Sequence, residues 1–163
     1  MKQIIEVKKP FDLDKIDITS LDRAAKKIVL VGGCFDVLHV GHVIFLEKAR
    51  AKGDLLIVLL ESDENIRKNK GENRPINNQE NRAKILSKLQ MVDKIIKLPE
   101  IKNDEEYLKI IKKIKPDIIA VSDGDENLEK KIKQAKEVKA KLLKVTKIIP
   151  HQSTSRIIEI IKI

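Results

Sequence analysis

Two unbroken apolar runs constrain the fold of this chain more than any other feature of its sequence. Residues 28–31 and 55–60 consist only of isoleucine, leucine and valine. A strand that is apolar at every position is buried on both faces, as in a parallel sheet that helices cover on each side. Each run is followed by a helix-like stretch, and strand and helix patterns alternate from there to the end of the chain. This alternation favours a doubly wound parallel sheet with right-handed crossovers.

The alternation predicts a single α/β domain, Rossmann-like, with a five-stranded parallel sheet and helices on both faces. The predicted strands cover residues 28–31, 55–60, 94–98, 118–121 and 141–145. The predicted helices cover residues 41–52, 78–89, 104–114, 126–139 and 153–162. The domain spans residues 28–163. Residues 1–27 are expected to form an N-terminal extension, with a short strand near residues 4–7 and a short helix near residues 20–27.

The segment that joins the first predicted strand to the first predicted helix carries the strongest functional signal. It reads Gly-Gly-Cys-Phe-Asp-Val-Leu-His-Val-Gly-His over residues 32–42. Gly32 and Gly33 lack a Cβ, so the backbone could bend there and approach an anion closely. A helix beginning near Val40 would place His39 and His42 on the same side of its first turn. Because a helix N-terminus and imidazole donors both favour phosphate, the sequence predicts a phosphate site at this sheet edge.

The pattern Gly-x-Phe-Asp-x-x-His-x-Gly-His, residues 33–42, resembles the signature of the cytidylyltransferase-like nucleotidyltransferases. The resemblance extends over residues 28–162. In that family the two histidines bind and stabilise nucleotide phosphates, which implies a catalytic role for His39 and His42. It also implies that Asp36 orients either the loop or a magnesium-bound water. The loop residues implied in nucleotide binding are Gly32, Gly33, Cys34, Phe35, Asp36 and Gly41.

Two cationic residues follow the second predicted strand and its polar loop. Lys-Gly-x-x-Arg-Pro-Ile-Asn, residues 70–77, resembles the corresponding loop of the family and makes Lys70 the third predicted catalytic residue. The alternative for this segment is a solvated basic loop. Arg82 corresponds to an arginine that the family places in the next helix. Its forked guanidinium could bind nucleotide phosphate or pair with a nearby acid such as Glu80, and the sequence leaves both open.

Two further segments lie at the end of a predicted strand and at the start of the last helix. Ser-Asp-Gly-Asp, residues 122–125, resembles a Gly-Asp segment near the base or the acceptor in relatives, although an ordinary turn explains it equally well. The heptose-phosphate adenylyltransferases usually carry Lys-Gly-Gly-Asp there, so the missing lysine leaves the acceptor open. Residues 153–155 resemble the family's triphosphate-binding hydroxyl motif, although helix capping alone explains Ser153. The nucleotide-binding residues implied here are Asp123, Gly124, Ser153, Thr154 and Ser155.

The reaction implied by the resemblance is nucleotidyl transfer. A phosphate oxygen of a phosphorylated small molecule attacks the α-phosphate of ATP or CTP, and pyrophosphate leaves. Mg²⁺ would accompany the nucleotide, bound mostly through water. The loop at residues 70–77 most resembles that of the adenylyltransferases that make ADP-heptose, which favours ATP and a sugar phosphate such as heptose 1-phosphate. Glycerol-3-phosphate cytidylyltransferases and archaeal FAD synthases are close alternatives, and a nucleotide-binding regulatory domain is the alternative without turnover. Relatives of this size commonly form homodimers.

Composition argues against several other classes of protein. The 34 basic and 25 acidic residues give a net charge of +9, which would suit a nucleic-acid partner. The lysines are interleaved with acids, however, and three phenylalanines and one tyrosine offer few platforms for base stacking. The single cysteine, Cys34, excludes an intramolecular disulfide and a multi-cysteine zinc site. The longest uncharged apolar stretch, residues 37–46, is shorter than the roughly 18 residues of a membrane span. We therefore expect a cytoplasmic protein without nucleic-acid or membrane partners and without a side-chain metal site.

Overall fold

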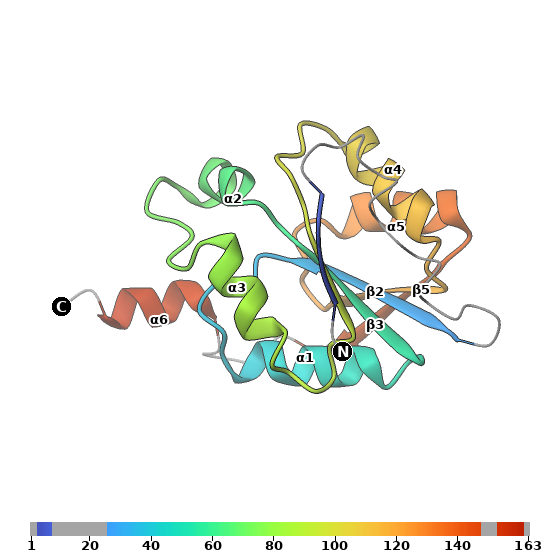
Figure 1. Cartoon of the computed structure of the whole chain (residues 1–163), viewed down its shortest axis with the longest axis horizontal. Helices are drawn as coiled ribbons and strands as arrows, with labels where there is room; N and C mark the ends of the chain where they lie inside the picture. Colours follow the sequence, from blue (N-terminus) through green and yellow to red (C-terminus); the bar gives the residue numbers. More distant parts are fainter. Residues whose placement is uncertain (1–2, 8–25, 148–152, 162–163) are drawn as a thin grey trace.

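The computed structural model of the chain describes residues 3–7, 26–147 and 153–161. Within these residues it contains six strands and six helices (Figure 1). The strands are β1 (Gln3–Glu6), β2 (Ile28–Gly33), β3 (Leu55–Leu60), β4 (Lys94–Lys97), β5 (Ile118–Ser122) and β6 (Lys141–Thr146). The helices are α1 (Val40–Arg50), α2 (Asp63–Lys70), α3 (Gln79–Leu86), α4 (Asp104–Ile114), α5 (Leu128–Val138) and α6 (Thr154–Ile161).

The strands form one parallel sheet in the order β1-β4-β3-β2-β5-β6. The apolar runs predicted as buried strands are β2 and β3, which pair from Ile28 opposite Leu55 to Gly33 opposite Leu60. Because the strands are parallel, the segments that follow β2, β3 and β5 leave the sheet at the same edge. The predicted α/β domain with a parallel sheet is therefore confirmed, and its carboxyl edge is where the site residues after β2 begin.

The sheet has six strands and not the predicted five, because part of the N-terminal extension belongs to it. Strand β1 pairs with β4, with Ile4 opposite Ile95 and Ile5 opposite Ile96. The side chains of Ile5 and Val7 are buried in the core. A four-residue strand gives a weak periodic pattern, and its partner β4 lies far away in the sequence, so no local signal indicates that it joins the sheet. The helix expected near residues 20–27 falls mostly outside the described residues, and Lys26 and Lys27 are not helical.

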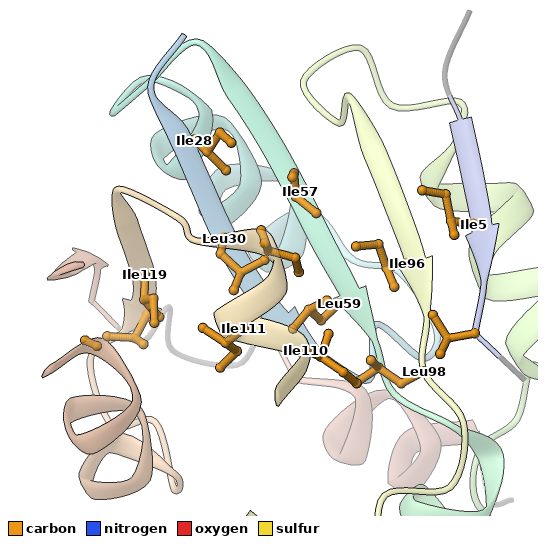
Figure 2. Packing of buried hydrophobic residues seen from close by; sticks show 14 residues of the cluster. Ile5, Ile28, Leu30, Ile57, Leu59, Ile96, Leu98, Ile110, Ile111 and Ile119 are labelled. Carbon is orange, nitrogen blue, oxygen red and sulfur yellow. The ribbon is translucent and has the colours of Figure 1, made fainter. Parts of the chain in front are cut away.

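Helices cover both faces of the sheet and divide the core in two. On one face, α4 and α5 pack over the sheet, and Figure 2 shows Ile110 and Ile111 of α4 in the same cluster as Leu30 and Leu59. The other face is covered by α1 and α3, whose buried residues include Leu46, Ala49, Ala83 and Leu86. Each crossover begins at the carboxyl edge of the sheet, so the N-termini of α1 and α4 face that edge from opposite layers.

Helix α2 occupies part of the segment that was expected to be a polar loop. Its N-cap is Ser62, whose hydroxyl accepts a hydrogen bond from the Asn65 amide over 3.2 Å. Of its eight residues only Asn65 and Ile66 are buried, so the helix has almost no apolar stripe that could reveal it in the sequence. None of the helices in the described part of the chain is long and apolar enough to cross a membrane.

Candidate active site

The two signature histidines open helix α1. His39 is the N-cap, with extended backbone angles, and His42 lies in the first turn. Their rings are stacked, with centroids 3.9 Å apart and an angle of 28° between the planes. The His39 amide donates a hydrogen bond of 3.4 Å to His42 Nδ1. Among the described residues, His39 Nδ1 is buried without a hydrogen-bond partner, which is costly unless a ligand supplies one.

Both imidazoles are neutral near pH 7. Burial lowers the pKa of His42 to about 4, and the charges of His39 and Lys70 act in the same direction. Burial also lowers the pKa of His39. A neutral imidazole carries one N–H donor, so the pair offers two donors at a helix N-terminus without adding positive charge to a site that holds no anion. A phosphate group placed there would raise both pKa values.

The bend of the signature loop lies after the glycines and not at them. Gly32 and Gly33 continue strand β2, whereas Phe35 and Val37 have φ angles of 48° and 46°. These are left-handed values that residues other than glycine rarely adopt, and a β-branched valine least of all. Backbone strain of this kind persists only where surrounding contacts enforce it, and it concentrates at functional sites.

Asp36, between the two left-handed residues, supplies those contacts. Its carboxylate accepts hydrogen bonds from Arg74 Nε, from the Ile76 amide and from the Asn77 amide, at 2.9, 2.9 and 3.0 Å. Burial alone would raise the pKa of Asp36, but the bonds from Asn77, Ile76 and Arg74 outweigh it and lower that pKa. The carboxylate of Asp36 thus ties the signature loop to residues 74–77, and its predicted contact with a magnesium-bound water stays a prediction.

Thr154, at the start of α6, is joined to the same loop. Its hydroxyl donates a hydrogen bond of 2.6 Å to the Asp36 carbonyl. Ser153 accepts a hydrogen bond from the Arg156 amide with its hydroxyl and so caps α6. Ser155 is exposed. The first turn of α6 therefore lies against the loop that leads to the histidines, although the two segments are more than a hundred residues apart (Figure 1). The predicted contact of residues 153–155 with a triphosphate stays a prediction.

Arg82 is buried, with no exposed side-chain surface, and its guanidinium holds three loops together. It donates to the carbonyls of Asn77, Cys34 and Glu61 at 2.9, 2.6 and 2.8 Å. It also forms an ion pair with Asp63 at 2.6 Å. Of the two possibilities for Arg82, the structure shows an ion pair with a nearby acid, which is Asp63 and not Glu80. A direct bond to phosphate stays a prediction.

Lys70 is the last residue of α2 and is exposed. Its charge acts on His42 and Cys34 of the signature segment. Burial lowers the pKa of His42 most, and the charges of His39 and then Lys70 lower it further. Burial raises the pKa of the Cys34 thiol, and the Lys70 charge is the strongest effect that opposes it. The flexible amine of Lys70 is thus within electrostatic reach of His42 and Cys34, and its predicted role in binding phosphate stays a prediction.

Among the described residues, no hydrogen bond or ion pair joins the Asp-Gly segment after β5 to the histidines, and its contact with a nucleotide stays a prediction. Asp123 is exposed and pairs with Lys144 of β6 at 3.1 Å, and Gly124 has a φ of 77°, as a turn requires. Two residues at the same sheet edge went unpredicted, Glu61 after β3 and Tyr107 in the first turn of α4. Glu61 directly follows a buried strand, which is a detectable signal, whereas nothing in the sequence singles out Tyr107.

Comparison with known proteins places this chain in a family. The family model described as cytidylyltransferase-like matches residues 30–160. The Bifunctional protein HldE of Aliarcobacter butzleri is 44% identical over 139 residues, which cover 85% of this chain and 28% of that protein. The HldE of Helicobacter pylori is 39% identical over 153 residues, covering 92% of this chain and 30% of that protein. The chain thus spans less than a third of the length of these two relatives.

Solved structures agree with this placement. The lipopolysaccharide core biosynthesis protein of Thermoplasma volcanium has a TM-score of 0.59 and 27% identity, over 77% of this chain and 98% of that protein. A pantoate-β-alanine ligase of Francisella tularensis has a TM-score of 0.60 over 91% of this chain and 69% of that protein. Its 17% identity means that this likeness concerns the fold alone. The signature segment, the family model and the relatives agree, and the chain belongs to the cytidylyltransferase-like family.

Proposed function

We propose that this protein transfers a nucleoside monophosphate from a nucleoside triphosphate, ATP, to a phosphorylated sugar such as heptose 1-phosphate, and releases pyrophosphate. The observation that carries the proposal is the stacked pair His39 and His42 at the N-terminus of α1, with a buried Nδ1 atom that lacks a partner among the described residues. Thr154 anchors a second helix N-terminus to the same loop. Two helix N-termini and two neutral imidazoles supply hydrogen-bond donors that can bind phosphate groups.

The chemistry requires no covalent intermediate on the protein. A phosphate oxygen of the acceptor forms a bond to the α-phosphorus, the bond from that phosphorus to the bridging oxygen breaks, and pyrophosphate leaves with the electron pair. His39 and His42 donate hydrogen bonds to the oxygens that gain charge, and Lys70 balances the charge of the leaving phosphates. The hydroxyls of residues 153–155 bind the far end of the triphosphate. Catalysis then consists of positioning and charge stabilisation.

Mg²⁺ enters this scheme as part of the nucleotide substrate. Among the described residues, no three carboxylate, histidine or cysteine side chains gather into a metal site. Both carboxylate oxygens of Asp36 already accept hydrogen bonds from the protein. We therefore expect triphosphate oxygens and water to hold the ion, which suits the preference of Mg²⁺ for retaining its waters.

The choice of substrates rests on sequence similarity. The Lys-Gly-x-x-Arg-Pro-Ile-Asn loop at residues 70–77 and the identity to HldE proteins support ATP and a heptose phosphate. In the structure Arg74, Ile76 and Asn77 of this loop hold Asp36, so the loop also shapes the signature segment. CTP with glycerol 3-phosphate, and ATP with FMN, are the substrate pairs of the alternative enzymes.

A pyrophosphate-release assay tests the proposal. The protein is supplied with Mg²⁺, with ATP or CTP, and with heptose 1-phosphate, glycerol 3-phosphate or FMN in turn. The proposal predicts release with ATP and heptose 1-phosphate above all other pairs. Release with another pair would reassign the substrates and keep the reaction. Nucleotide binding without release from any pair would favour a regulatory domain.

The homodimer also remains a proposal. Helix α6 carries four isoleucines, and none of its described residues is buried within the single chain. Ile160 and Ile161 are 63% and 70% exposed. A second copy that covers this helix would remove apolar surface from water. Light scattering during size-exclusion chromatography would report a mass of twice 18.6 kDa for a dimer and 18.6 kDa for a monomer.

A further inference from the structure

The carboxyl edge of the sheet carries a carboxylate and a phenol that the proposed reaction does not use. They are Glu61, which directly follows β3, and Tyr107, in the first turn of α4. Both lie against the end of β2, Glu61 at Gly33 and Tyr107 at Gly32. The Glu61 amide donates to the Gly33 carbonyl at 3.1 Å, and Tyr107 Oη lies 2.5 Å from where a Cβ on Gly32 would stand. The absence of a side chain at Gly32 is what admits the hydroxyl.

Both groups are held in place and keep hydrogen-bonding capacity. Glu61 Oε1 accepts hydrogen bonds from the Ser62 amide at 3.0 Å and from Asn65 Nδ2 at 3.1 Å, which leaves Oε2 for another donor. The Tyr107 ring packs against the core formed with α4 and α5. Burial raises the pKa of Tyr107, and the Glu61 charge raises it further, so the phenol stays protonated and remains a donor.

The position of the pair separates it from the groups that bind phosphate. His39 and His42 open α1, which covers one face of the sheet, whereas Tyr107 belongs to α4 on the opposite face. A carboxylate beside a bound triphosphate would repel it, but a carboxylate and a phenol readily bind the hydroxyls of a polyol.

We infer that Glu61 and Tyr107 recognise the acceptor, by binding hydroxyl groups of a sugar or polyol whose phosphate reaches toward the histidines. This inference rests on the proposed function. It adds that Glu61 and Tyr107 select an acceptor that is rich in hydroxyl groups. Glu61 Oε2 accepts a hydrogen bond from one hydroxyl of the acceptor, and Tyr107 Oη donates to another.

Two single-atom changes test the pair. In Tyr107→Phe the ring and its packing remain and only the hydroxyl is lost, and in Glu61→Gln the charge is lost while the shape is kept. Initial rates of pyrophosphate release are measured with ATP and with heptose 1-phosphate varied separately. We expect the KM for heptose 1-phosphate to rise about tenfold or more in Glu61→Gln and about three- to tenfold in Tyr107→Phe. The KM for ATP should stay within about twofold of that of the unchanged protein.

Glu64→Gln is the matched control. Glu64 lies three residues after Glu61, in the first turn of α2, but it is exposed and pairs with Arg67 at 3.4 Å, so the variant removes the same charge outside the site. Its KM values should not change. Melting temperatures of all three variants show whether they are folded, and calorimetric binding of ATP shows whether the nucleotide site is intact.

The outcomes separate this inference from the proposed function. If the unchanged protein is active and both variants keep its KM for heptose 1-phosphate, the inference is wrong and the proposed function stands. If the variants weaken ATP binding instead, the pair faces the nucleotide and the inference is also wrong. If the unchanged protein releases pyrophosphate with no sugar or polyol phosphate, the proposed function is wrong and this inference with it.

Discussion

The imidazoles of His39 and His42 lie face to face, 3.9 Å apart between centroids, at the N-terminus of α1. We predict that His42→Ala lowers the kcat for pyrophosphate release by about 10²-fold or more, because a donor aimed at the developing phosphate charge is lost. Val43→Ala, which shortens an apolar side chain in the same turn of the helix, serves as the control for packing. Equal rates for His42→Ala and the unchanged protein would remove His42 from the site.

The low pKa of His42 makes stability depend on pH in a definite direction. In the unfolded chain the imidazole titrates near 6.5, and in the folded protein at about 4. Between these values the unfolded state binds the proton and the folded state does not. The contribution of His42 to the free energy of unfolding is therefore complete above pH 6.5 and is lost as the pH falls toward 4. Allowing for the part of the ring that solvent reaches, we expect a loss on the order of 2 kcal/mol.

Urea denaturation from pH 4 to pH 8 measures this effect. His42→Asn is the comparison, because an asparagine oxygen can still accept the hydrogen bond from the His39 amide but does not titrate. The free energy of unfolding should fall more steeply toward pH 4 in the unchanged protein than in the variant. Parallel curves would show that His42 is not held neutral by burial.

Arg82 should contribute to the free energy of unfolding because it joins three loops. Arg82→Met removes the guanidinium donor from Asp63 Oδ1 and from the carbonyls of Cys34, Glu61 and Asn77. Removing one partner of a buried ion pair costs about 3–5 kcal/mol, and we expect a loss of that size in urea denaturation. Arg67→Met, which breaks only the exposed pair with Glu64, should cost less than about 0.5 kcal/mol. Equal effects of the two substitutions would contradict the role given to Arg82.

Gly32 and Tyr107 should be energetically coupled. A Cβ at Gly32 would stand 2.5 Å from Tyr107 Oη but 3.8 Å from the ring carbon that carries it. Gly32→Ala should therefore destabilise the protein by about 1–3 kcal/mol through overpacking. The double variant with Tyr107→Phe lacks the clashing oxygen and should recover much of that loss. A double-mutant cycle in urea measures the coupling, and strict additivity of the two changes would show that the atoms do not meet.

The sequence was sufficient where local signals agreed. Strand 55–60 and helix 104–114 were predicted with the bounds that the structure has. The strand is a fully apolar run, and the helix begins after Asn103, whose side chain caps it, and ends before Pro116. The histidine pair was predictable because strand, loop and helix start are contiguous in the chain. In such a segment the spacing of residues indicates which side chains share the first turn of the helix.

The parts that were missed depend on contacts between distant segments. The positive φ angles of Phe35 and Val37 are compensated by bonds to Asp36 from residues about forty positions later. The four bonds of Arg82 reach back as far as Cys34. Strand β1 becomes part of the sheet only because β4 lies beside it. None of these partnerships leaves a periodic or local pattern, so the sequence could suggest that Asp36 and Arg82 matter without showing how.

The central claim is that the stacked histidines support transfer of a nucleotidyl group to a sugar phosphate. It is tested most directly by ³¹P NMR and mass spectrometry of a mixture of the protein, ATP, Mg²⁺ and heptose 1-phosphate. The account predicts equal amounts of pyrophosphate and of a nucleotide-sugar in which the acceptor phosphate is bonded to the former α-phosphate. ATP that is bound yet remains intact, or that yields ADP and a sugar bisphosphate, would contradict it.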